Sequence, residues 1–515
     1  MAIPESSIEK WLLETVGLED EEQRRIRRNQ LERAVEEFSE KGYEIKDIIS
    51  QGGSGVILKG EVKDPEKIQE RYFDELSFGS TEDVGYSMAD LIARAIVVSS
   101  YFFDKEKKSI VKDPSRGEKF KSVKQAEEVL KKYSRPDLEK ILEQLASRSF
   151  PRKGQMIAIK LSLNPGDKRF RREKRIAPLN LLKEKGAKNV VAYYEYGLVC
   201  DEYRYHVLEY IMNAVPLREL PLLEQKLKGF MVLLSGLKFI HEYGNIVHRD
   251  IKPGNFLIRV RPNKDYKDYI EATSNLQAAL KERFEVMTRQ RQTDRTNYLQ
   301  IQRLQEKKKR LDELVQELEE KKKELPRKLK VSGGKITDFG LAKFLNKELK
   351  PNDIWTYTTE GGTVLGTPFY MAPELAPEGD DSPSHDFRCD IYSAGAVLYE
   401  ILTEKPPYMD RMDELELRSF TDYLYKVVAD RSVKPTHPKR LNKHADPYLI
   451  KICAKAIHRD MNMRYKNVWE MASDIERWHE YRKKSALRRF GARLADTILG
   501  ISPIPGRDLS SQVFR

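Results

Sequence analysis

Two kinds of hydrophobic pattern follow one another along the chain. Three stretches rich in β-branched residues, YEIKDIIS, GVILKGEV and MIAIKLSL, are bounded by glycine or proline and predict strands. The preceding residues, 5–41, predict two helices, and from about residue 220 onward the apolar spacing is mainly helical. The pattern predicts an α+β protein with its first strands in the N-terminal half.

Two long segments interrupt this order. The first holds roughly 90 residues, about 62–152, between the second and third predicted strands, and its apolar spacing is mostly helical. The second, about 262–328, contains no glycine or proline between Pro262 and Pro326. We call these two segments the first and second insertions.

The second segment carries a heptad seam with lysine at two positions. Seam residues recur at alternating spacings of three and four: Ile301, Leu304, Lys308, Leu311, Val315, Leu318, Lys322 and Leu325. The heptad spacing is interrupted around QTDRTN, where we place a turn. This predicts an antiparallel coiled-coil hairpin, each arm around 40 Å long if about 28 residues are helical.

Composition adds a preference for anionic partners. The 515 residues include 93 Lys and Arg against 81 Asp and Glu, which gives a net charge of +12 and a pI near 9.1. Such a balance favours nucleotide, nucleic acid or an acidic surface, although a lysine-rich helical surface is the more common explanation. At 40% hydrophobic residues, the chain has enough apolar material for a sizeable core.

The spacing of the cysteines and the lengths of the apolar stretches indicate the cellular compartment in which the protein is expected. Cys200, Cys389 and Cys453 are far apart without a C-x-x-C pair, so the sequence suggests neither a zinc site nor a disulfide framework. The N-terminus does not resemble a signal peptide, and the longest apolar stretches fall short of the roughly 20 residues that cross a bilayer. We expect a soluble cytoplasmic protein.

The triplet HRD occurs twice, ending at Asp250 and at Asp460. Asp250 is followed by Lys252, Asn255 and a short apolar run. The carboxylate can accept a hydroxyl proton, the lysine can neutralise oxygen charge, and the amide oxygen can take a metal ion. The second triplet lacks both the lysine and the asparagine, so the predicted chemistry belongs to Asp250.

Two further motifs suit a nucleotide site. Asp338, in ITDFGLAK, ends a β-like segment, where a carboxylate can hold magnesium across phosphates. Gly52, Gly53 and Gly55 join two predicted strands, and their backbone N–H groups can approach phosphates closely. Any tight hairpin also uses glycine, so this loop alone decides nothing.

A lysine in a buried strand needs an anionic partner. Lys160, in IAIK, is such a residue, and Glu173 on the predicted helix that follows is the candidate partner.

In chain order, the motifs are a Gly-rich loop, A-I-K, a helical Glu, HRDIKPGN, DFG and GTPFYMAPE. This series resembles the eukaryotic-like (Hanks-type) serine/threonine protein kinase family over roughly 43–260 and 328–480. The resemblance implies a bilobal protein-kinase-like fold with a β-rich N-lobe and a helical C-lobe, here with the inserted coiled-coil hairpin. The expected divisions are a helical extension, N-lobe, C-lobe and basic helical tail: 1–42, 43–208, 209–480 and 481–515.

The resemblance also implies a role for each matching residue. Asp250 looks like the catalytic aspartate, assisted by Lys252, while Lys160 would hold ATP phosphates and pair with Glu173. Asn255 and Asp338 look like the Mg²⁺ ligands. The rest of the ATP site would consist of Gly52, Gly53, Gly55, Ile57, Ala158, Glu209, Ile211 and Leu257.

The implied reaction is transfer of the γ-phosphate of ATP to serine or threonine hydroxyls of protein substrates. Lys252 and Thr367 favour these acceptors over tyrosine by family analogy. Candidate autophosphorylation sites lie in the activation loop that runs from Asp338 to Glu374: Thr358, Thr359 and Thr363. A phosphate there could pair with Arg249 and order the loop.

Other interpretations stay open at this point. A nucleotide-binding pseudokinase scaffold, acting through its coiled-coil arm, is the main alternative, although the retained lysine, carboxylates and amide argue against it. The arm suits a protein partner or self-association, with a structural spacer as the plain alternative. Nucleic acid has only the net charge and the basic tail in its favour. Near the second HRD, the resemblance implies that Arg464 pairs with Glu374, which leaves Asp460 a structural role.

Overall fold

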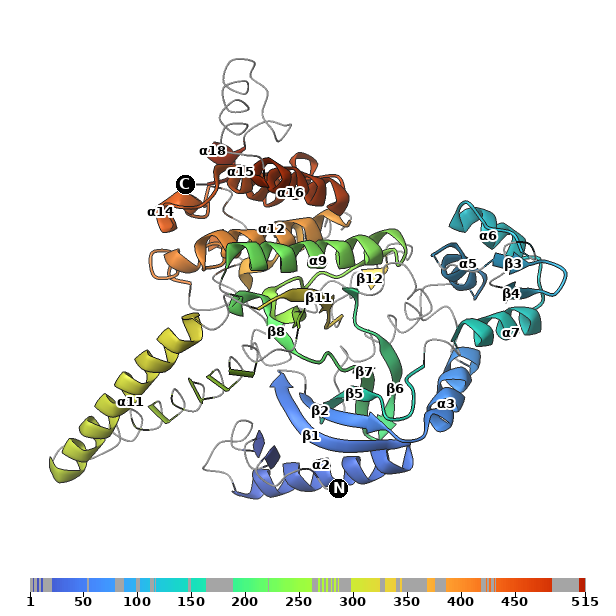
Figure 1. Cartoon of the computed structure of the whole chain (residues 1–515), viewed down its shortest axis with the longest axis horizontal. Coiled ribbons are helices and arrows are strands. Elements are labelled where there is room, and N and C mark those ends of the chain that lie inside the picture. Colours follow the sequence, from blue (N-terminus) through green and yellow to red (C-terminus); the bar gives the residue numbers. More distant parts are fainter. Residues whose placement is uncertain are drawn as a thin grey trace, which may run out of the picture. The chain divides into compact units, whose positions relative to one another are not determined.

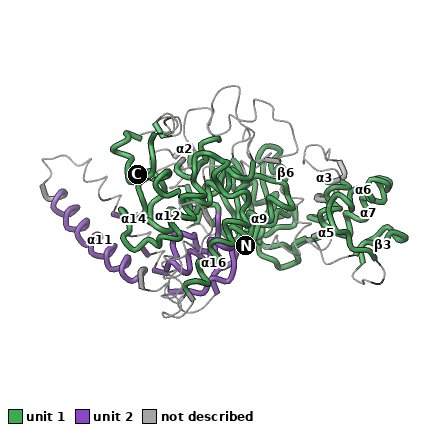
Figure 2. Tube along the Cα trace, turned by 90° about the horizontal axis from the view of Figure 1, so that it is seen from above, with its two compact units in different colours: residues 1–210, 233–255, 335–515 green, residues 211–232, 256–334 purple. Residues whose placement is uncertain are grey.

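The computed structural model (Figure 1) describes most of the chain in ordered segments. The described residues are 3, 7–8, 11–12, 21–52, 55–78, 88–98, 102–111, 115, 117–146, 150–163, 189–220, 222–261, 267–268, 271–272, 275–276, 279, 282–283, 286, 298–324, 329–339, 343–344, 368–375, 386–417, 423, 426–427, 430, 432–483 and 509–514. Figure 2 shows two compact units, residues 1–210, 233–255 and 335–515, and residues 211–232 and 256–334.

A five-stranded antiparallel sheet forms the N-lobe. Its strands follow the order β1-β2-β5-β7-β6 and comprise Tyr43–Gly52, Gly55–Val62, Met156–Ser162, Tyr203–Glu209 and Tyr193–Val199. The three strands predicted from β-branched stretches are β1, β2 and β5, and all three are confirmed. Strand β5 lies in the centre of the sheet, which fixes its lysine between two neighbours.

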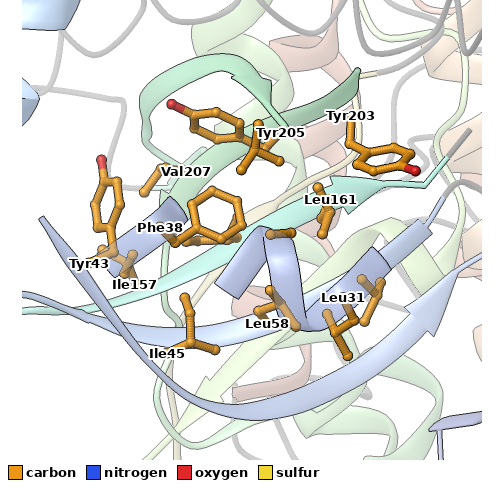
Figure 3. Packing of buried hydrophobic residues seen from close by; sticks show 14 of the residues in the cluster. Leu31, Phe38, Tyr43, Ile45, Leu58, Ile157, Leu161, Tyr203, Tyr205 and Val207 are labelled. Carbon is orange, nitrogen blue, oxygen red and sulfur yellow. The ribbon is translucent and has the colours of Figure 1, made fainter. Parts of the chain in front are cut away.

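The two faces of this sheet carry different kinds of side chain. Ile157, Ile159 and Leu161 of β5 belong to one apolar cluster, shown in part in Figure 3. Because side chains alternate along a strand, Ala158 and Lys160 point to the opposite face. The apolar cluster therefore supports the sheet from one side and leaves the other side for the site.

The N-terminal helix α2 (Glu21–Glu40) closes the apolar face of the sheet. Leu31, Ala34 and Phe38 are fully buried in the same cluster, and Figure 3 shows Phe38 among the sheet side chains. The Phe38 ring meets Tyr205 edge-on with 5.0 Å between centroids. The helix ends before Gly42, whose φ of +92° favours glycine, as the sequence predicts.

The first insertion folds as its own helical layer with a small hairpin. Its elements are α3 (Pro65–Phe78), α5 (Met88–Val98), β3 (Phe102–Asp104), β4 (Ser109–Val111), α6 (Val123–Leu130) and α7 (Arg135–Ala146). Helix α5 packs against α6 and α7, and residues such as Ile92, Phe103 and Ile141 are fully buried. The mostly helical character is confirmed, while the β3–β4 hairpin was not predicted.

Helices dominate the C-lobe. They are α9 (Leu223–Glu242), α12 (Arg388–Thr403), α14 (Pro438–Leu441), α15 (Pro447–Ala456) and α16 (Val468–Lys483). Helix α12 is buried along nearly its whole length and packs on α15. At this crossing a Cβ on Gly395 would lie 2.6 Å from the Cβ of Ala456, so glycine permits the close approach. The described elements thus have the α+β composition expected from the motifs, with an antiparallel sheet followed mainly by helices.

The second insertion leaves and returns through a strand pair. β8 (Ala214–Pro216), β10 (Phe256–Val260) and β11 (Val331–Ile336) form a sheet in the order β11-β10-β8. The backbone N–H of Arg261 donates to the carbonyl of Lys330 at 3.0 Å. The two ends of the insertion therefore lie close together.

Helix α11 (Tyr298–Glu324) is the returning arm of this insertion. Val315 and Leu318 are buried in one cluster with Leu276 and Ala279, and Arg283 pairs with Asp312. Along these contacts, residue numbers rise in the first segment while they fall in α11, as in an antiparallel pair. The full coiled-coil hairpin stays a prediction, because most of residues 262–297 lie outside the described ranges.

The last described residues, 509–514, pack against the C-lobe. Residues Ser510–Val513 form the short helix α18, and Leu509, Val513 and Phe514 are buried. The Phe514 ring lies 5.9 Å from that of Tyr399 on α12. The predicted basic helix at 481–515 lies largely outside the described residues. Among the described helices, none combines the length and the apolar character needed to span a bilayer.

Candidate active site

The loop after strand β9 (Ile246–Val247) gathers three predicted site residues. The Asn255 amide nitrogen donates to both the carbonyl oxygen and Oδ2 of Asp250, each at 2.8 Å. Lys252 Nζ lies 2.7 Å from the same Oδ2. One oxygen of Asp250 is thus held by a cation and an amide, which fixes the carboxylate.

A buried aspartate that the sequence analysis missed supports this loop from below. Asp390 of α12 accepts hydrogen bonds from the backbone N–H groups of His248 at 2.7 Å and Arg249 at 2.8 Å. His241 Nε2 lies 2.8 Å from Asp390 Oδ2. Burial alone would raise the pKa of Asp390, but these partners hold it below its ordinary value.

The loop needs this support because its backbone is strained. Arg249 has a φ of +68°, in the region that side-chain-bearing residues rarely occupy. The sequence carried one sign of Asp390, which is one of two carboxylates, with Glu400, in the otherwise largely apolar stretch CDIYSAGAVLYEIL.

The ITDFG segment is bonded to the same loop. Thr337 donates its backbone N–H to the carbonyl of Asn255 at 2.9 Å. The Thr337 carbonyl lies 3.1 Å from His248 Nε2, and the buried Phe339 ring packs against His248 with 4.6 Å between centroids. Asp338 is therefore positioned by hydrogen bonds of the residue before it and by ring packing of the residue after it.

Lys160 and Asp338 form an ion pair with 3.1 Å between Nζ and Oδ1. Lys160 is nearly buried, whereas the Asp338 side chain is 40% exposed. Desolvation works against ionisation of Asp338, but the Lys160 ammonium holds the pKa of its carboxyl well below the usual range. The predicted partner of Lys160, Glu173, lies outside the described residues.

The glycine loop follows directly from the pairing of β1 with β2. Gly52 pairs with Gly55, so the turn between them contains only residues 53 and 54. Gly55 has a φ of +145°, and a Cβ there would lie 2.0 Å from the carbonyl oxygen of Leu161. Glycine is thus obligatory at Gly55, while Gly53 lies outside the described residues.

The predicted adenine contacts are only partly brought together. Ala158 pairs with Leu208 across β5 and β7, and Ile57 pairs with Lys160 across β2 and β5. The Glu209 carboxylate is held 2.8 Å from Lys335 Nζ. Two further residues, Ile211 and Leu257, belong to the second compact unit, so their contact with adenine stays a prediction.

The donor set fits a magnesium ion. The Asn255 amide nitrogen is used twice by Asp250, which leaves the amide oxygen as its remaining polar atom. Asp338 is ionised and uses Oδ1 for Lys160, which leaves Oδ2. An amide oxygen and a carboxylate are ligands that Mg²⁺ accepts, with substrate phosphates completing the shell.

The second HRD triplet lies at the start of a short turn in the C-lobe. Asp460 Oδ1 accepts the backbone N–H of Asn462 at 2.9 Å and starts a short 3₁₀ turn. Arg464, whose side chain is fully buried, donates to both carboxylate oxygens of Glu374 at 2.6 and 2.8 Å. The expected Arg464–Glu374 pair is confirmed. The candidate phosphosites Thr358, Thr359 and Thr363 lie outside the described residues.

Comparison with known families matches the protein kinase domain over residues 149–269 and 286–474. Because the match covers more than half of the 515 residues, the chain belongs to the protein kinase family. The fold, the HRD loop and the DFG segment described above are consistent with that membership.

Curated bacterial relatives are similar over the kinase domain. Serine/threonine-protein kinase PknB of Mycolicibacterium smegmatis is 34% identical over 148 residues, 28% of this chain and 20% of that protein. A probable serine/threonine-protein kinase of Streptomyces coelicolor, SCO3848, is 30% identical over 161 residues, 31% of this chain and 21% of that protein. The chain thus spans about a fifth of the length of the curated relatives it matches.

Proposed function

We propose that this protein is an ATP-dependent protein kinase that transfers the γ-phosphate to serine or threonine hydroxyls. The observation that carries the proposal is two bonded pairs, Asp250 with Asn255 and Lys160 with Asp338. The backbone hydrogen bond from Thr337, which precedes Asp338, to Asn255 links the two segments. Its bacterial relatives named as serine/threonine kinases support the acceptor type, as does Lys252 beside Asp250.

In the proposed reaction the acceptor hydroxyl is oriented by Asp250, which takes the proton as the new P–O bond forms. The bond from the γ-phosphorus to the bridging oxygen breaks, and ADP leaves with that electron pair. Lys252 neutralises charge that builds on the transferred group, and Lys160 holds the remaining phosphates. When bound by Asn255 and Asp338, Mg²⁺ would offset phosphate charge.

The rest of the ATP site follows from the same proposal. Backbone N–H groups of the Gly52–Gly55 turn would cover the phosphates. Ile57, Ala158 and Leu257 would enclose the adenine ring. The backbone groups of Glu209 and Ile211 would bond its edge, and Glu173 would pair with Lys160.

We infer three further features. Autophosphorylation would fall on the activation loop, at Thr358, Thr359 or Thr363, and Arg249 would receive the phosphate. The helical arm around α11 would serve a protein partner or self-association, and its exposed positions are largely charged rather than apolar. A cytoplasmic location is supported by Cys389 and Cys453, which are buried and unpaired.

The test is phosphate transfer from radiolabelled ATP–Mg²⁺ to the chain itself and to casein, followed by phosphoamino acid analysis. We expect phosphoserine or phosphothreonine, and a loss of at least about 100-fold in Lys160→Met. A wild-type protein that binds ATP–Mg²⁺ without any transfer would instead be a nucleotide-binding scaffold. Phosphotyrosine alone would contradict the acceptor assignment.

A further inference from the structure

The first insertion makes a specific contact outside the N-lobe. Arg94 of α5 donates from Nε to both oxygens of Asp90, at 2.9 and 3.1 Å. Its Nη1 donates to the carbonyl oxygen of Tyr243 at 2.8 Å. Both side chains of the Arg94–Asp90 pair are only 12% exposed. The guanidinium is therefore oriented by its own helix and directed at a C-lobe backbone atom.

The accepting carbonyl has a particular place in the fold. Tyr243 immediately follows α9, and its own N–H donates back to Phe239. The last carbonyls of a helix lack intrahelical partners and carry partial negative charge, so a cation there is favourable. Three residues later β9 begins, and it leads directly to His248 and Asp250. Arg94 thus caps the backbone that enters the catalytic loop.

The other side of the insertion is joined to the strand that carries Lys160. Helix α7 ends at Ala146 and β5 begins at Met156, so nine residues, 147–155, connect them. The insertion therefore has a covalent connection to one half of the proposed site and a hydrogen bond at the entrance to the other half.

The start of the insertion is anchored as well. Arg71 of α3 forms a two-bond pair with Glu195 of β6, with both distances 2.9 Å. Glu195 is 1% exposed and also accepts hydrogen bonds from the hydroxyls of Tyr43 and Tyr205. Removing one member of this buried set would leave an uncompensated charge in the protein interior, which is strongly destabilising. The Arg71–Glu195 pair therefore anchors the start of the insertion to the sheet.

We propose that the first insertion, residues 65–146, is a clasp between the two lobes, and that Arg94 is its C-lobe contact and a positioning residue for phosphate transfer. By holding the end of α9, Arg94 limits the movement of the catalytic loop relative to Lys160. The effect on rate rests on the proposed kinase function, whereas the restraint on α9 does not.

The test compares Arg94→Ala, Arg94→Lys and a control, Arg135→Ala, in the full chain. Arg135 lies in the same insertion but pairs with Glu139 at the surface, with 69% of its side chain exposed. Hydrogen exchange is measured without nucleotide across residues 238–247, and kcat and KM are measured with ATP and casein.

In Arg94→Ala we expect exchange at 238–247 to rise about tenfold, the equivalent of one hydrogen bond to a charged group. The value of kcat should fall several-fold while KM for casein is unchanged. Arg94→Lys should recover part of both effects, because an ammonium can still donate to the Tyr243 carbonyl. Arg135→Ala should match the wild type.

Equal exchange at 238–247 in Arg94→Ala and Arg135→Ala would overturn the proposal. A rise confined to residues 88–98, with kcat unchanged, would also overturn it, because Arg94 would then only stabilise the insertion. If the wild type transfers no phosphate, the kinase proposal fails, and the exchange data still decide whether the clasp exists.

Discussion

Asp390 fixes a strained backbone that lies 141 residues earlier in the chain, at Arg249. A carboxylate suits this task because it only accepts hydrogen bonds, and both N–H groups of the loop point at it. An amide of the same shape would present its NH₂ group to one of these donors. Replacing one carboxylate oxygen of Asp390 by an amide nitrogen is therefore expected to disturb the backbone at Arg249 and, with it, the geometry of Asp250, which follows Arg249.

We predict that Asp390→Asn lowers the free energy of unfolding by about 2–4 kcal/mol, since hydrogen bonds to charged groups are lost. Phosphate transfer should fall at least about tenfold in the protein that remains folded. Urea unfolding and the transfer assay measure the two effects. Asp430→Asn, at an exposed carboxylate, is the control. An Asp390→Asn protein as active and stable as this control would refute the role.

The Lys160–Asp338 pair predicts a pH dependence. Because the folded-state pKa of Asp338 is depressed below its unfolded value of about 3.9, the pair stabilises the fold above that pH. This contribution is lost as the pH falls through the folded-state pKa. The difference in unfolding free energy between wild type and Lys160→Met should therefore have its largest value near pH 6 and decrease below about pH 4.

Urea unfolding at several pH values between about 3 and 6 measures that difference. Lys238→Met is the control, because Lys238 pairs with Glu242 at the surface. A difference that stays constant, or that grows on acidification, would contradict the assigned ionisation of Asp338.

At the scale of elements, helix α2 completes the N-lobe sheet. Its apolar residues cover the sheet face opposite Lys160. Because the side chains of β5 alternate between the two faces, the packing of α2 on one face supports the strand that positions Lys160 on the other. The helix is a structural part of the lobe, and the apolar face of the sheet would meet water without it.

We predict that Phe38→Ala lowers the free energy of unfolding by about 3–5 kcal/mol, because a fully buried ring is removed from a packed cluster. Glu36→Ala, on the exposed side of the same helix, should change it by less than about 0.5 kcal/mol. Thermal and urea unfolding provide the comparison. Similar values for the two variants would show that α2 does not support the sheet.

These elements show which features the sequence could reveal. β1, β2 and β5 were predictable because short stretches rich in β-branched residues lie between glycine or proline breaks. The Arg464–Glu374 pair was implied by the resemblance to protein kinases. The β3–β4 hairpin was not, because strands of three residues have no measurable period. Asp390 and the buried Phe514 were missed for another reason: their partners lie far away in the sequence, and only the folded chain brings them together.

At the scale of the whole molecule, the two insertions depart most from a plain kinase domain. The second leaves at Arg261 and returns at Lys330 through paired backbone, so its length need not disturb the strands that carry it. We therefore expect the arm to be separable from phosphate transfer.

Replacing residues 263–328 with a four-residue glycine-containing turn should keep transfer to casein within about twofold of the wild type, because shortening a loop costs little free energy. Light scattering on both proteins would show whether the arm mediates self-association. Loss of transfer in a folded, shortened protein would place the arm within the catalytic machinery.

The central claim is that the first HRD triplet performs phosphate transfer and the second supports the fold. Its most direct test is the rate of phosphate transfer from ATP–Mg²⁺ in wild type, Asp250→Asn and Asp460→Asn, with folding checked by circular dichroism. We predict a loss of at least about 1,000-fold for Asp250→Asn and near-normal transfer for Asp460→Asn, because asparagine also starts short helical turns well. Equal and complete loss in both folded variants, or persistent transfer in Asp250→Asn, would contradict the account.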